Sequence, residues 1–460
     1  EYCDNNGNSS IDKFHLYKLL DDSLRFSKEE LLYENILVEM LAKEEIYSTS
    51  ENRIALSMLY YCEKKILDFF NIRKDNKNKK IIDNFEEYLE KKQKTLGFTL
   101  SSEQQKAVEL INSGEKTLFL IGYAGTGKST SSRAILELLE EIVSYDDIIA
   151  IALSGIASQR ISDTTGYNAS TIQSLLVKHK EKDFFPYKVI LLDEASMVNS
   201  VTFAQIISKI SDDTIFIIVG DDGQLPAIGA GNILADSIKY ELAPICKLTK
   251  IYRQNENQAI AVIANDIRKG ELPNYKEEYE DFKFVDVSIG NYYSMKNSLT
   301  QNEFSDMRGE NSEYILNNIL NIASNYIQNY YDFIKEKNIG KALTLFQVIT
   351  PMKGGVLGVE NLNIELQRLF NHTKNRSLKI KDIEYKLTDK VIHIKNENMK
   401  AQTMSMYKSN STEFMERRVY NGQLGLVIKL DFDEKKCVVL YPNDDMVVFY
   451  DFDNIHHLLN

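Results

Sequence analysis

The chain of 460 residues is poor in cysteine and lacks both a long hydrophobic run and an excess of positive charge. The four cysteines are scattered along the chain, at Cys3, Cys62, Cys246 and Cys437. They lack the spacing of metal ligands, which indicates a reducing, intracellular setting. No apolar run approaches the roughly 18 residues of a membrane span, and the polar start of the chain has no signal-peptide pattern. We therefore expect a cytoplasmic protein with no membrane partner.

The net charge of −12 argues, on its own, against a nucleic-acid partner. Net charge averages over the whole surface, however, and a groove can be basic while the exterior is acidic. The composition, 43% hydrophobic and 27% charged, is ordinary for a globular protein. A chain of this length is expected to form about three or more domains. Length, charge and composition therefore do not identify a function, which has to be inferred from the sequence motifs.

One glycine-rich segment carries the strongest signal. It matches G-x-x-x-x-G-K-[S/T] and lies between an apolar, β-prone run at 116–121 and a run with helical spacing at 131–140. This order of strand, loop and helix is the context of a Walker A phosphate loop, in which glycines let backbone N–H groups surround phosphates. We expect Lys128 to reach the β- and γ-phosphates of a nucleotide and the Ser129 hydroxyl to hold Mg²⁺. The candidate nucleotide contacts are Gly122, Ala124, Gly125, Thr126, Gly127, Lys128, Ser129 and Thr130.

Two later strands also end in polar side chains. A buried-strand pattern at 189–192 runs into Asp193 and Glu194, which has the form of a Walker B site. There the Asp binds Mg²⁺ and the Glu polarises the attacking water. Another strand, 214–220, leads to Gln224, whose amide can donate to a phosphate and accept from water. Alone, the acidic pair could be a helix cap and the loop an ordinary turn. Their order behind the phosphate loop predicts a parallel sheet with its ligand beyond the carboxyl ends of the strands.

Several segments between about residues 96 and 457 together resemble a superfamily 1 helicase, close to the RecD-like branch and to phage Dda-type helicases. Residues 98–108 resemble the Q-motif, in which a glutamine reads the adenine edge. Gln104 fits the register best and Gln105 is the alternative. Residues 220–226 are similar to motif III, and residues 248–254 to motif IV. The resemblance implies that Arg253 contacts the γ-phosphate, for which a guanidinium fork is suited.

The same resemblance implies a path for DNA. Residues 153–157 and 169–175 resemble motifs Ia and Ib, although the family usually has His where this chain has Gln173. Residues 349–363 resemble the start of a second RecA-like lobe, and 419–425 resemble an N-G-x-x-G turn in a small inserted β-barrel. Short strands at 426–430, 437–441 and 446–450 agree with such a barrel. The implied DNA contacts are Ser154, Gly155, Thr171, Gln173, Pro351, Met352, Asn421 and Gly422.

The expected fold class is α/β: a P-loop NTPase with two RecA-like lobes, a helical N-terminal segment and an inserted SH3-like β-barrel. The expected domains are a helical N-terminal domain at 1–95, a first RecA-like lobe at 96–270, a connecting region at 271–345, an incomplete second lobe at 346–384 with the C-terminal remainder, and a barrel at 385–457.

Some segments carry more local predictions. Helical spacing is present at 28–41 and 54–70, whereas 73–80 has the composition of a solvated basic linker and 288–312 is loop-like. In relatives a strand-separating pin lies before the Walker B strand. That stretch is short here, and residues 184–186 are the best remnant of a pin.

By resemblance, the function is that of a DNA helicase that uses ATP and Mg²⁺ and moves 5′→3′ on single-stranded DNA. The expected partners are single-stranded DNA and duplex junctions, with DNA repair or replication proteins, and the chain is expected to be a monomer. The family's motifs V and VI do not occur and the first residue is not Met. We therefore expect a piece of a longer protein in which hydrolysis is weakened. Two alternatives stay open: an RNA helicase of the same superfamily, and a non-hydrolysing nucleotide switch or DNA-binding module.

Overall fold

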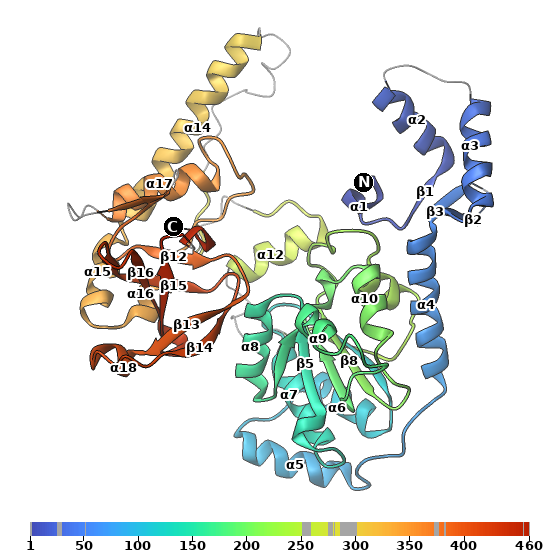
Figure 1. The fold of residues 1–460 in the computed structure, drawn as a ribbon. Helices are drawn as coiled ribbons and strands as arrows, with labels where there is room; N and C mark the ends of the chain where they lie inside the picture. The colour runs from blue at the N-terminus through green and yellow to red at the C-terminus, as the bar shows by residue number, and fades with distance from the viewer. Residues whose placement is uncertain are drawn as a thin grey trace. The chain divides into compact units, whose positions relative to one another are not determined.

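The computed structural model describes residues 2–24, 30–50, 52–250, 259–274, 279, 281–285, 301–371, 377–380, 383–453 and 455–459. The chain divides into two compact units, an N-terminal unit of residues 1–282 and a C-terminal unit of residues 283–460 (Figure 1). The boundary falls inside the predicted connecting region. Among the described residues, no helix combines the length and the apolar character needed to cross a bilayer.

A six-stranded parallel sheet organises the N-terminal unit, with strand order β6-β5-β7-β8-β4-β9. Every residue of β4, β5, β7 and β8 is buried, as expected for a parallel sheet covered on both faces. The predicted strands are thereby confirmed. Their bounds are β4 Thr117–Gly122, β5 Ile148–Ala152, β6 Ala169–Thr171, β7 Val189–Leu192, β8 Ile215–Gly220 and β9 Ile245–Leu248.

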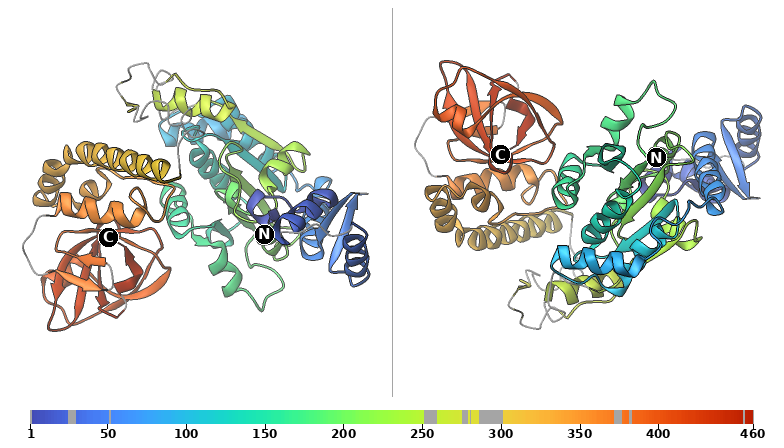
Figure 2. Two further views of the ribbon diagram at one scale, coloured as in Figure 1. Left: turned by 90° about the horizontal axis from the view of Figure 1, so that it is seen from above. Right: turned by 90° about the horizontal axis from the view of Figure 1, so that it is seen from below.

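Helices cover both faces of this sheet (Figure 2). Side chains of α6 (Ser102–Asn112), α7 (Lys128–Leu139) and α8 (Gly155–Thr165) share one core with alternate strand residues. The intervening strand residues form a second core with α4 (Ser57–Lys74), α9 (Ile172–Lys178), α10 (Ser200–Ile207) and α11 (Ile233–Lys239). Because successive strand residues point to opposite faces, one apolar run supplies both cores.

The N-terminal 95 residues are not wholly helical, which corrects the sequence prediction. Helices α1 (Tyr2–Asn6), α2 (Lys13–Leu24) and α3 (Glu30–Ala42) accompany an antiparallel sheet of β1 (Ser10–Asp12), β3 (Arg53–Leu56) and β2 (Ile46–Ser50). Residues 54–56 therefore belong to a strand, and α4 begins at Ser57. Ile46 and Ile54 are buried against Tyr17, Tyr33 and Leu37, so tertiary packing overrides the local helical spacing.

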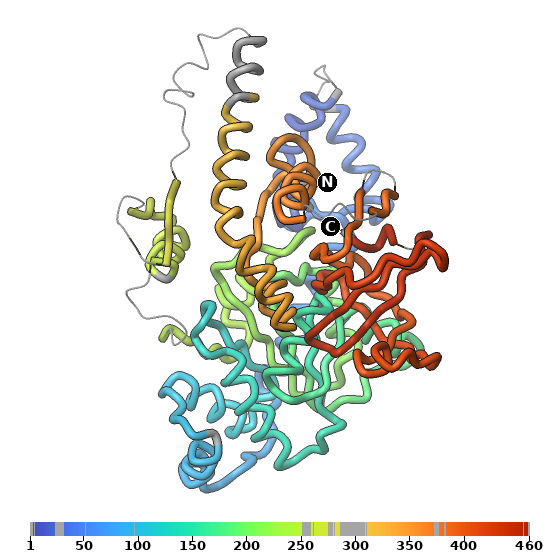
Figure 3. The backbone as a smooth tube through the Cα atoms, turned by 90° about the vertical axis from the view of Figure 1, so that its left-hand side faces the viewer, coloured from blue at the N-terminus to red at the C-terminus, as the bar shows by residue number. Residues whose placement is uncertain are grey.

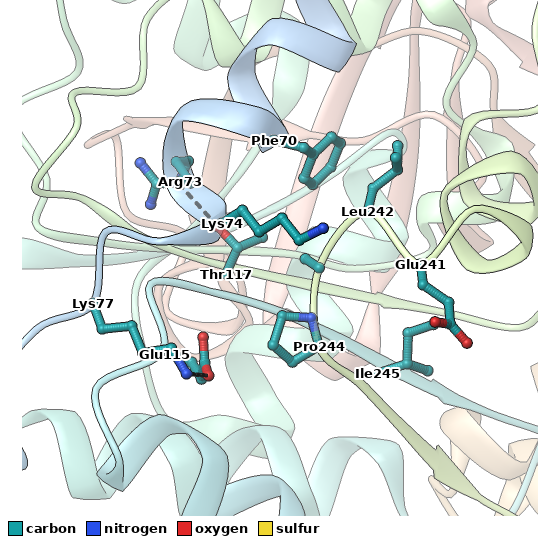
Figure 4. A pocket seen from close by; sticks show the side chains of 11 residues that line it. Phe70, Arg73, Lys74, Lys77, Glu115, Thr117, Glu241, Leu242, Pro244 and Ile245 are labelled. Carbon is teal, nitrogen blue, oxygen red and sulfur yellow. Dashed lines mark hydrogen bonds and ion pairs between the residues drawn. The ribbon is translucent and has the colours of Figure 1, made fainter.

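The predicted basic linker is also partly wrong. Arg73 lies in the last turn of α4 and is only 5% exposed. Its guanidinium donates to Thr117 Oγ1 at 2.9 Å, to the Lys116 carbonyl at 3.0 Å, and to the Thr214 carbonyl. Figure 4 shows this side chain beside a cavity of about 420 Å³ at the amino ends of β4 and β9. Arg73 therefore fastens α4 to the sheet, and α5 (Phe85–Leu96) follows the connecting segment.

The C-terminal unit begins, in its described part, with helices. These are α14 (Gln301–Ser324), α15 (Ile327–Lys335), α16 (Ile339–Thr344) and α17 (Val359–Phe370), and α14 lies against α17 (Figure 3). Residues 301–312 are thus helical, which corrects the loop prediction for that part. Residues 286–300 lie outside the described range. The stretch 301–324 contains no Pro and a single Gly, so its composition permits a long helix.

The rest of this unit is an antiparallel sheet of strand order β14-β13-β17-β16-β15-β12-β18, with a separate hairpin of β10 and β11. The predicted strands at 426–430, 437–441 and 446–450 are confirmed. The bounds are β10 Leu378–Ile380, β11 Ile383–Tyr385, β12 Lys390–His393, β13 Glu397–Thr403, β14 Met415–Val419, β15 Leu424–Asp431, β16 Lys436–Tyr441, β17 Met446–Asp451 and β18 Leu458–Leu459, with α18 at Met404–Lys408.

Two parts of the domain prediction stay predictions. The described strands β10–β18 pair only antiparallel, and residues 346–350 are not in a strand, so a second RecA-like sheet is not among the described elements. The sheet ends at β14 and β18, and no described pairing joins these two strands into a closed barrel.

Candidate nucleotide and nucleic-acid site

The loop between β4 and α7 has the geometry of an anion cradle. Gly125 and Gly127 adopt φ values of +83° and +87°, which glycine reaches at little cost. Gly127 precedes α7 at the N-cap position and provides no side-chain cap, whereas side chains cap α6, α8, α9 and α10. The first N–H groups of α7 are therefore available to an anion, where the helix dipole also favours negative charge.

Lys128 occupies the first position of this helix. Its Nζ donates to the carbonyl of Gly122 at 2.6 Å and to the carbonyl of Tyr123 at 3.1 Å. Burial lowers the pKa of Lys128, while Asp221, Glu194 and Asp193 oppose that shift through their negative charge. The Lys128 side chain thus lies over the glycine-rich loop between β4 and α7. Thr126 is buried, and Ala124, Ser129 and Thr130 lie on the accessible side of the loop and first turn.

The acidic pair follows β7, which lies two strands from β4 in the sheet. Asp193 accepts a hydrogen bond from the Glu194 backbone N–H at 3.0 Å, and burial raises the pKa of its carboxyl. Glu194 has φ of +51°, a conformation that is uncommon for a residue with a side chain. Within the described part of the chain, no cluster of three or more His, Cys, Asp or Glu side chains is suited to a metal. Mg²⁺ commonly takes only one or two protein ligands beside phosphate oxygens, so the pairing of Ser129 with Asp193 as its ligands stays a prediction.

Gln224 connects the third strand end to the acidic pair. It follows β8, and its Oε1 accepts a hydrogen bond from Ser196 Oγ at 3.0 Å. Ser196 lies in the short 3₁₀ helix η2 (Ala195–Met197), directly after Glu194. This hydrogen bond links the loop of the predicted sensor glutamine to the turn that follows the predicted catalytic glutamate.

Gln104 lies at the phosphate loop, as the predicted register requires. It is buried, its Oε1 accepts from the Ser101 backbone N–H at 2.9 Å, and its Nε2 donates to the Gly127 carbonyl at 3.5 Å. Gln105 instead donates to the Leu100 carbonyl at 2.7 Å. The geometry favours Gln104 over Gln105 as the base-reading candidate. Arg253 lies outside the described residues.

The structure also reveals Arg268, which the sequence predictions missed. It belongs to α12 (Ala259–Lys269), and its Nη2 contacts Asp221 Oδ1 at 2.8 Å and Asp222 Oδ1 at 2.7 Å. Its guanidinium carbon lies 3.4 Å from the centre of the Tyr123 ring. No sequence motif marks this arginine, because its partners are more than 40 residues distant.

The DNA candidates of the N-terminal unit lie at the carboxyl ends of β5 and β6. Ser154 caps α8, and Thr171 is buried and caps α9, so the hydroxyls of both residues bind the backbone of their own helix. Gly155 is buried, whereas Gln173 is exposed. Two large apolar side chains flank the α8 cap and face solvent, Leu153 at 43% and Ile156 at 46% exposure.

The other DNA candidates belong to the C-terminal unit. Pro351 and Met352 are exposed and follow residues 346–350, which form neither helix nor strand. The Asn421–Gly422 turn is ordered by backbone contacts: Asn421 N–H donates to Asn396 Oδ1 at 2.8 Å, and Gly422 N–H donates to the His393 carbonyl at 2.6 Å. Gly422 has φ of +90°, as the turn prediction requires.

The proposed pin remnant is mostly core. Phe185 is 5% exposed and packs edge-on against His179, with ring centres 6.0 Å apart. Phe184 alone is an exposed aromatic in this segment. The described structure therefore offers no two-stranded pin between Gln173 and Asp193.

Parts of the chain are similar to known proteins. Residues 99–288 match the AAA_30 family, an AAA domain. The ATP-dependent RecD2 DNA helicase of Deinococcus radiodurans is 25% identical over 338 residues, covering 72% of this chain and 39% of that protein. The ATP-dependent DNA helicase RRM3 of Saccharomyces cerevisiae is 31% identical over 202 residues, covering 38% of this chain and 28% of that protein.

Among solved structures, Bacteroides Pif1 bound to single-stranded DNA is 17% identical, covers 77% of this chain and 74% of that one, and has a TM-score of 0.40. The chain spans about two fifths of RecD2 and less of RRM3. The family match covers the P-loop lobe, and the RecD2 alignment extends well beyond it. Over part of its length, the chain is therefore similar to an AAA domain family and to proteins named ATP-dependent DNA helicases.

Proposed function

We propose that this chain is the motor part of an ATP-dependent DNA helicase or translocase that moves 5′→3′ along single-stranded DNA. The observation that carries the proposal is the convergence of three motifs at adjacent strand ends. Lys128 follows β4, Gln224 follows β8, and Asp193 with Glu194 follows β7. Ligands of parallel α/β sheets bind at this edge.

Each of these side chains has a part in phosphoryl transfer to water. Lys128 would leave the Gly122 and Tyr123 carbonyls for the β- and γ-phosphates of ATP. Ser129 and Asp193 would hold Mg²⁺, which neutralises charge on the phosphate oxygens. Glu194 would orient and polarise the attacking water, and Gln224 would contact the γ-phosphate. Arg253, which the family resemblance places at the γ-phosphate, would complete this set.

A single strand of DNA would lie across the ends of β5 and β6. The exposed side chains of Leu153 and Ile156 can pack against bases, and the N-terminus of α8 and exposed Gln173 can contact phosphates. Apolar packing of this kind tolerates any base sequence, as a translocating protein requires.

The relatives support the same assignment. RecD2 and RRM3 are both named ATP-dependent DNA helicases, and the chain is similar to RecD2 over 338 residues and to RRM3 over 202 residues. Family resemblance adds further parts to the proposal. These are the direction of movement, duplex junctions as substrate, a monomeric state, a cytoplasmic location, and partners in DNA repair or replication.

The test is ATP hydrolysis measured against a length ladder of single-stranded DNA and RNA oligonucleotides of the same sequence. The proposal predicts that DNA raises the turnover number and that stimulation saturates once an oligonucleotide spans the binding path. Equal stimulation by RNA would favour the RNA helicase alternative. Tight binding of a fluorescent ATP analogue without turnover, with or without DNA, would favour the nucleotide switch.

A further inference from the structure

Arg268 joins two loops that the nucleotide motifs do not themselves connect. Its Nη2 contacts the carboxylates of Asp221 and Asp222, which open the sensor loop after β8. Its planar guanidinium stacks on Tyr123 of the phosphate loop, at 3.4 Å from the ring centre. The pairing is partly desolvated, because the Arg268 side chain is 20% exposed and that of Asp221 only 6%. Such pairs are stronger than exposed ones and fix geometry through the rigid fork.

The contact is closely packed. A Cβ added at Gly223 would overlap the Arg268 guanidinium, so a side chain at this position would displace the arginine from its contacts. Asp221 also accepts from the Gly223 backbone N–H at 3.0 Å, and Lys247 of β9 holds the second oxygen of Asp222 at 2.9 Å. The acidic side chains are therefore fixed from both sides, and Arg268 has little freedom to leave them.

The contacts form a chain that returns to the catalytic residues. Arg268 fixes Asp221 and Asp222, the sensor loop continues to Gln224, and Gln224 accepts from Ser196 beside Glu194. In the other direction, Arg268 stacks on Tyr123, whose carbonyl accepts from Lys128. Arg268 thus contacts both the sensor loop and the phosphate loop, so it can fix their relative position.

We propose that Arg268 is a positioning residue that holds Gln224 in register with the phosphate loop through Asp221, Asp222 and Tyr123. The inference rests on the proposed ATPase function. The role is one of positioning, because the guanidinium contacts the two carboxylates and the Tyr123 ring. Its removal lets the sensor loop shift relative to Lys128 and reduces turnover while leaving nucleotide binding.

A fluorescence experiment tests the stack independently of turnover. The chain has no tryptophan, so Tyr123→Trp introduces a single reporter at the stacked position. In this background Arg268→Ala is expected to raise the acrylamide quenching constant of the tryptophan by about twofold or more, since the covering cation is lost. Arg133→Ala is the matched control, because Arg133 is a half-exposed arginine of α7 paired with Glu137. Equal quenching in Arg268→Ala and the parent would overturn the proposal.

Kinetics of the otherwise native chain test the positioning role. We expect Arg268→Ala to lower kcat for ATP roughly tenfold or more, with KM and the affinity for a fluorescent ATP analogue changed less than about threefold. Arg268→Lys keeps the charge but not the fork or the planar stack, and should recover only part of the turnover. Unchanged kcat, full recovery in Arg268→Lys, or a large rise in KM at constant kcat would each contradict the proposal.

The two experiments separate this inference from the proposed function. A native chain that binds nucleotide without turnover would refute the ATPase proposal, whereas the quenching measurement would still show whether Arg268 covers position 123. Loss of the stack without loss of turnover would refute the positioning role alone.

Discussion

Replacing Arg73 by alanine is expected to destabilise the N-terminal unit without touching the nucleotide site. The guanidinium donates to Thr117 Oγ1, to the Lys116 and Ser211 carbonyls at 3.0 and 3.2 Å, and to the Thr214 carbonyl. Burial lowers the pKa of Arg73 to about 10, although Asp212 and Asp213 favour its charge. The hydrogen bonds therefore form against a desolvation cost.

The magnitude follows from what the alanine variant leaves behind. Each buried acceptor left without a donor costs about 1–3 kcal/mol. Arg73 donates to five acceptors, of which the Lys116, Ser211 and Asp212 carbonyls keep another donor, so the loss falls mainly on Thr117 Oγ1 and the Thr214 carbonyl. Two effects reduce that total. The desolvation cost of the cation disappears, and water from the adjoining cavity of about 420 Å³ can reach some of the acceptors. We expect a net loss of about 3 kcal/mol in unfolding free energy.

Urea unfolding followed by circular dichroism measures this loss. Lys74→Ala is the matched control, because Lys74 is the exposed neighbour on the same helical turn and lines the same cavity. The urea concentration at the unfolding midpoint should be well below the native and control values in Arg73→Ala, whereas the dependence of the unfolding free energy on urea should stay unchanged. A loss under about 0.5 kcal/mol, typical of surface substitutions, would refute the account of this anchor.

Three further predictions concern the site and the C-terminal unit. Lys128→Ala should abolish binding of a fluorescent ATP analogue. Glu194→Gln should bind the analogue normally but lose about a hundredfold or more in turnover. Normal turnover in Glu194→Gln would exclude Glu194 as the general base. The double variant Leu153→Ala, Ile156→Ala should raise several-fold the DNA concentration needed for half-maximal stimulation at unchanged basal turnover; an unchanged concentration would move the DNA path elsewhere. Burial lowers the pKa of His393 to about 4 from its ordinary 6.5, so the unfolded chain binds more protons between these values. Stability of the C-terminal unit should therefore fall as pH decreases from 6.5 to 4, by up to about 3 kcal/mol, and His393→Gln should flatten that dependence in acid titrations.

Local signals predicted the nucleotide-binding sheet. The continuous apolar runs of β4, β5, β7 and β8 identify buried strands without reference to any distant partner. Gly125 and Gly127 permit the positive φ values that the loop adopts. Gln104 was instead predicted from its resemblance to the Q-motif, and the structure places its side chain in the capping box of α6, beside the Gly127 carbonyl.

Residues whose role depends on distant contacts were missed. Arg73 lies in a basic run that is typical of a solvated linker, yet its acceptors belong to β4 and to the segment before β8. Arg268 ends an ordinary amphipathic helix, and its partners lie about 50 and 145 residues earlier in the chain. Strands β2 and β3 form because they pair with each other, because β3 also pairs with β1, and because Ile46 and Ile54 are buried. Local periodicity contains none of this information.

The most direct test of the central claim is steady-state ATP hydrolysis by the native chain with and without single-stranded DNA, beside Glu194→Gln. The account predicts that DNA stimulates turnover by the native chain, and that Glu194→Gln binds nucleotide and DNA but shows no stimulated turnover. Turnover that is the same with and without DNA, or that survives in Glu194→Gln, would contradict the assignment of the three strand ends as a DNA-driven ATPase site.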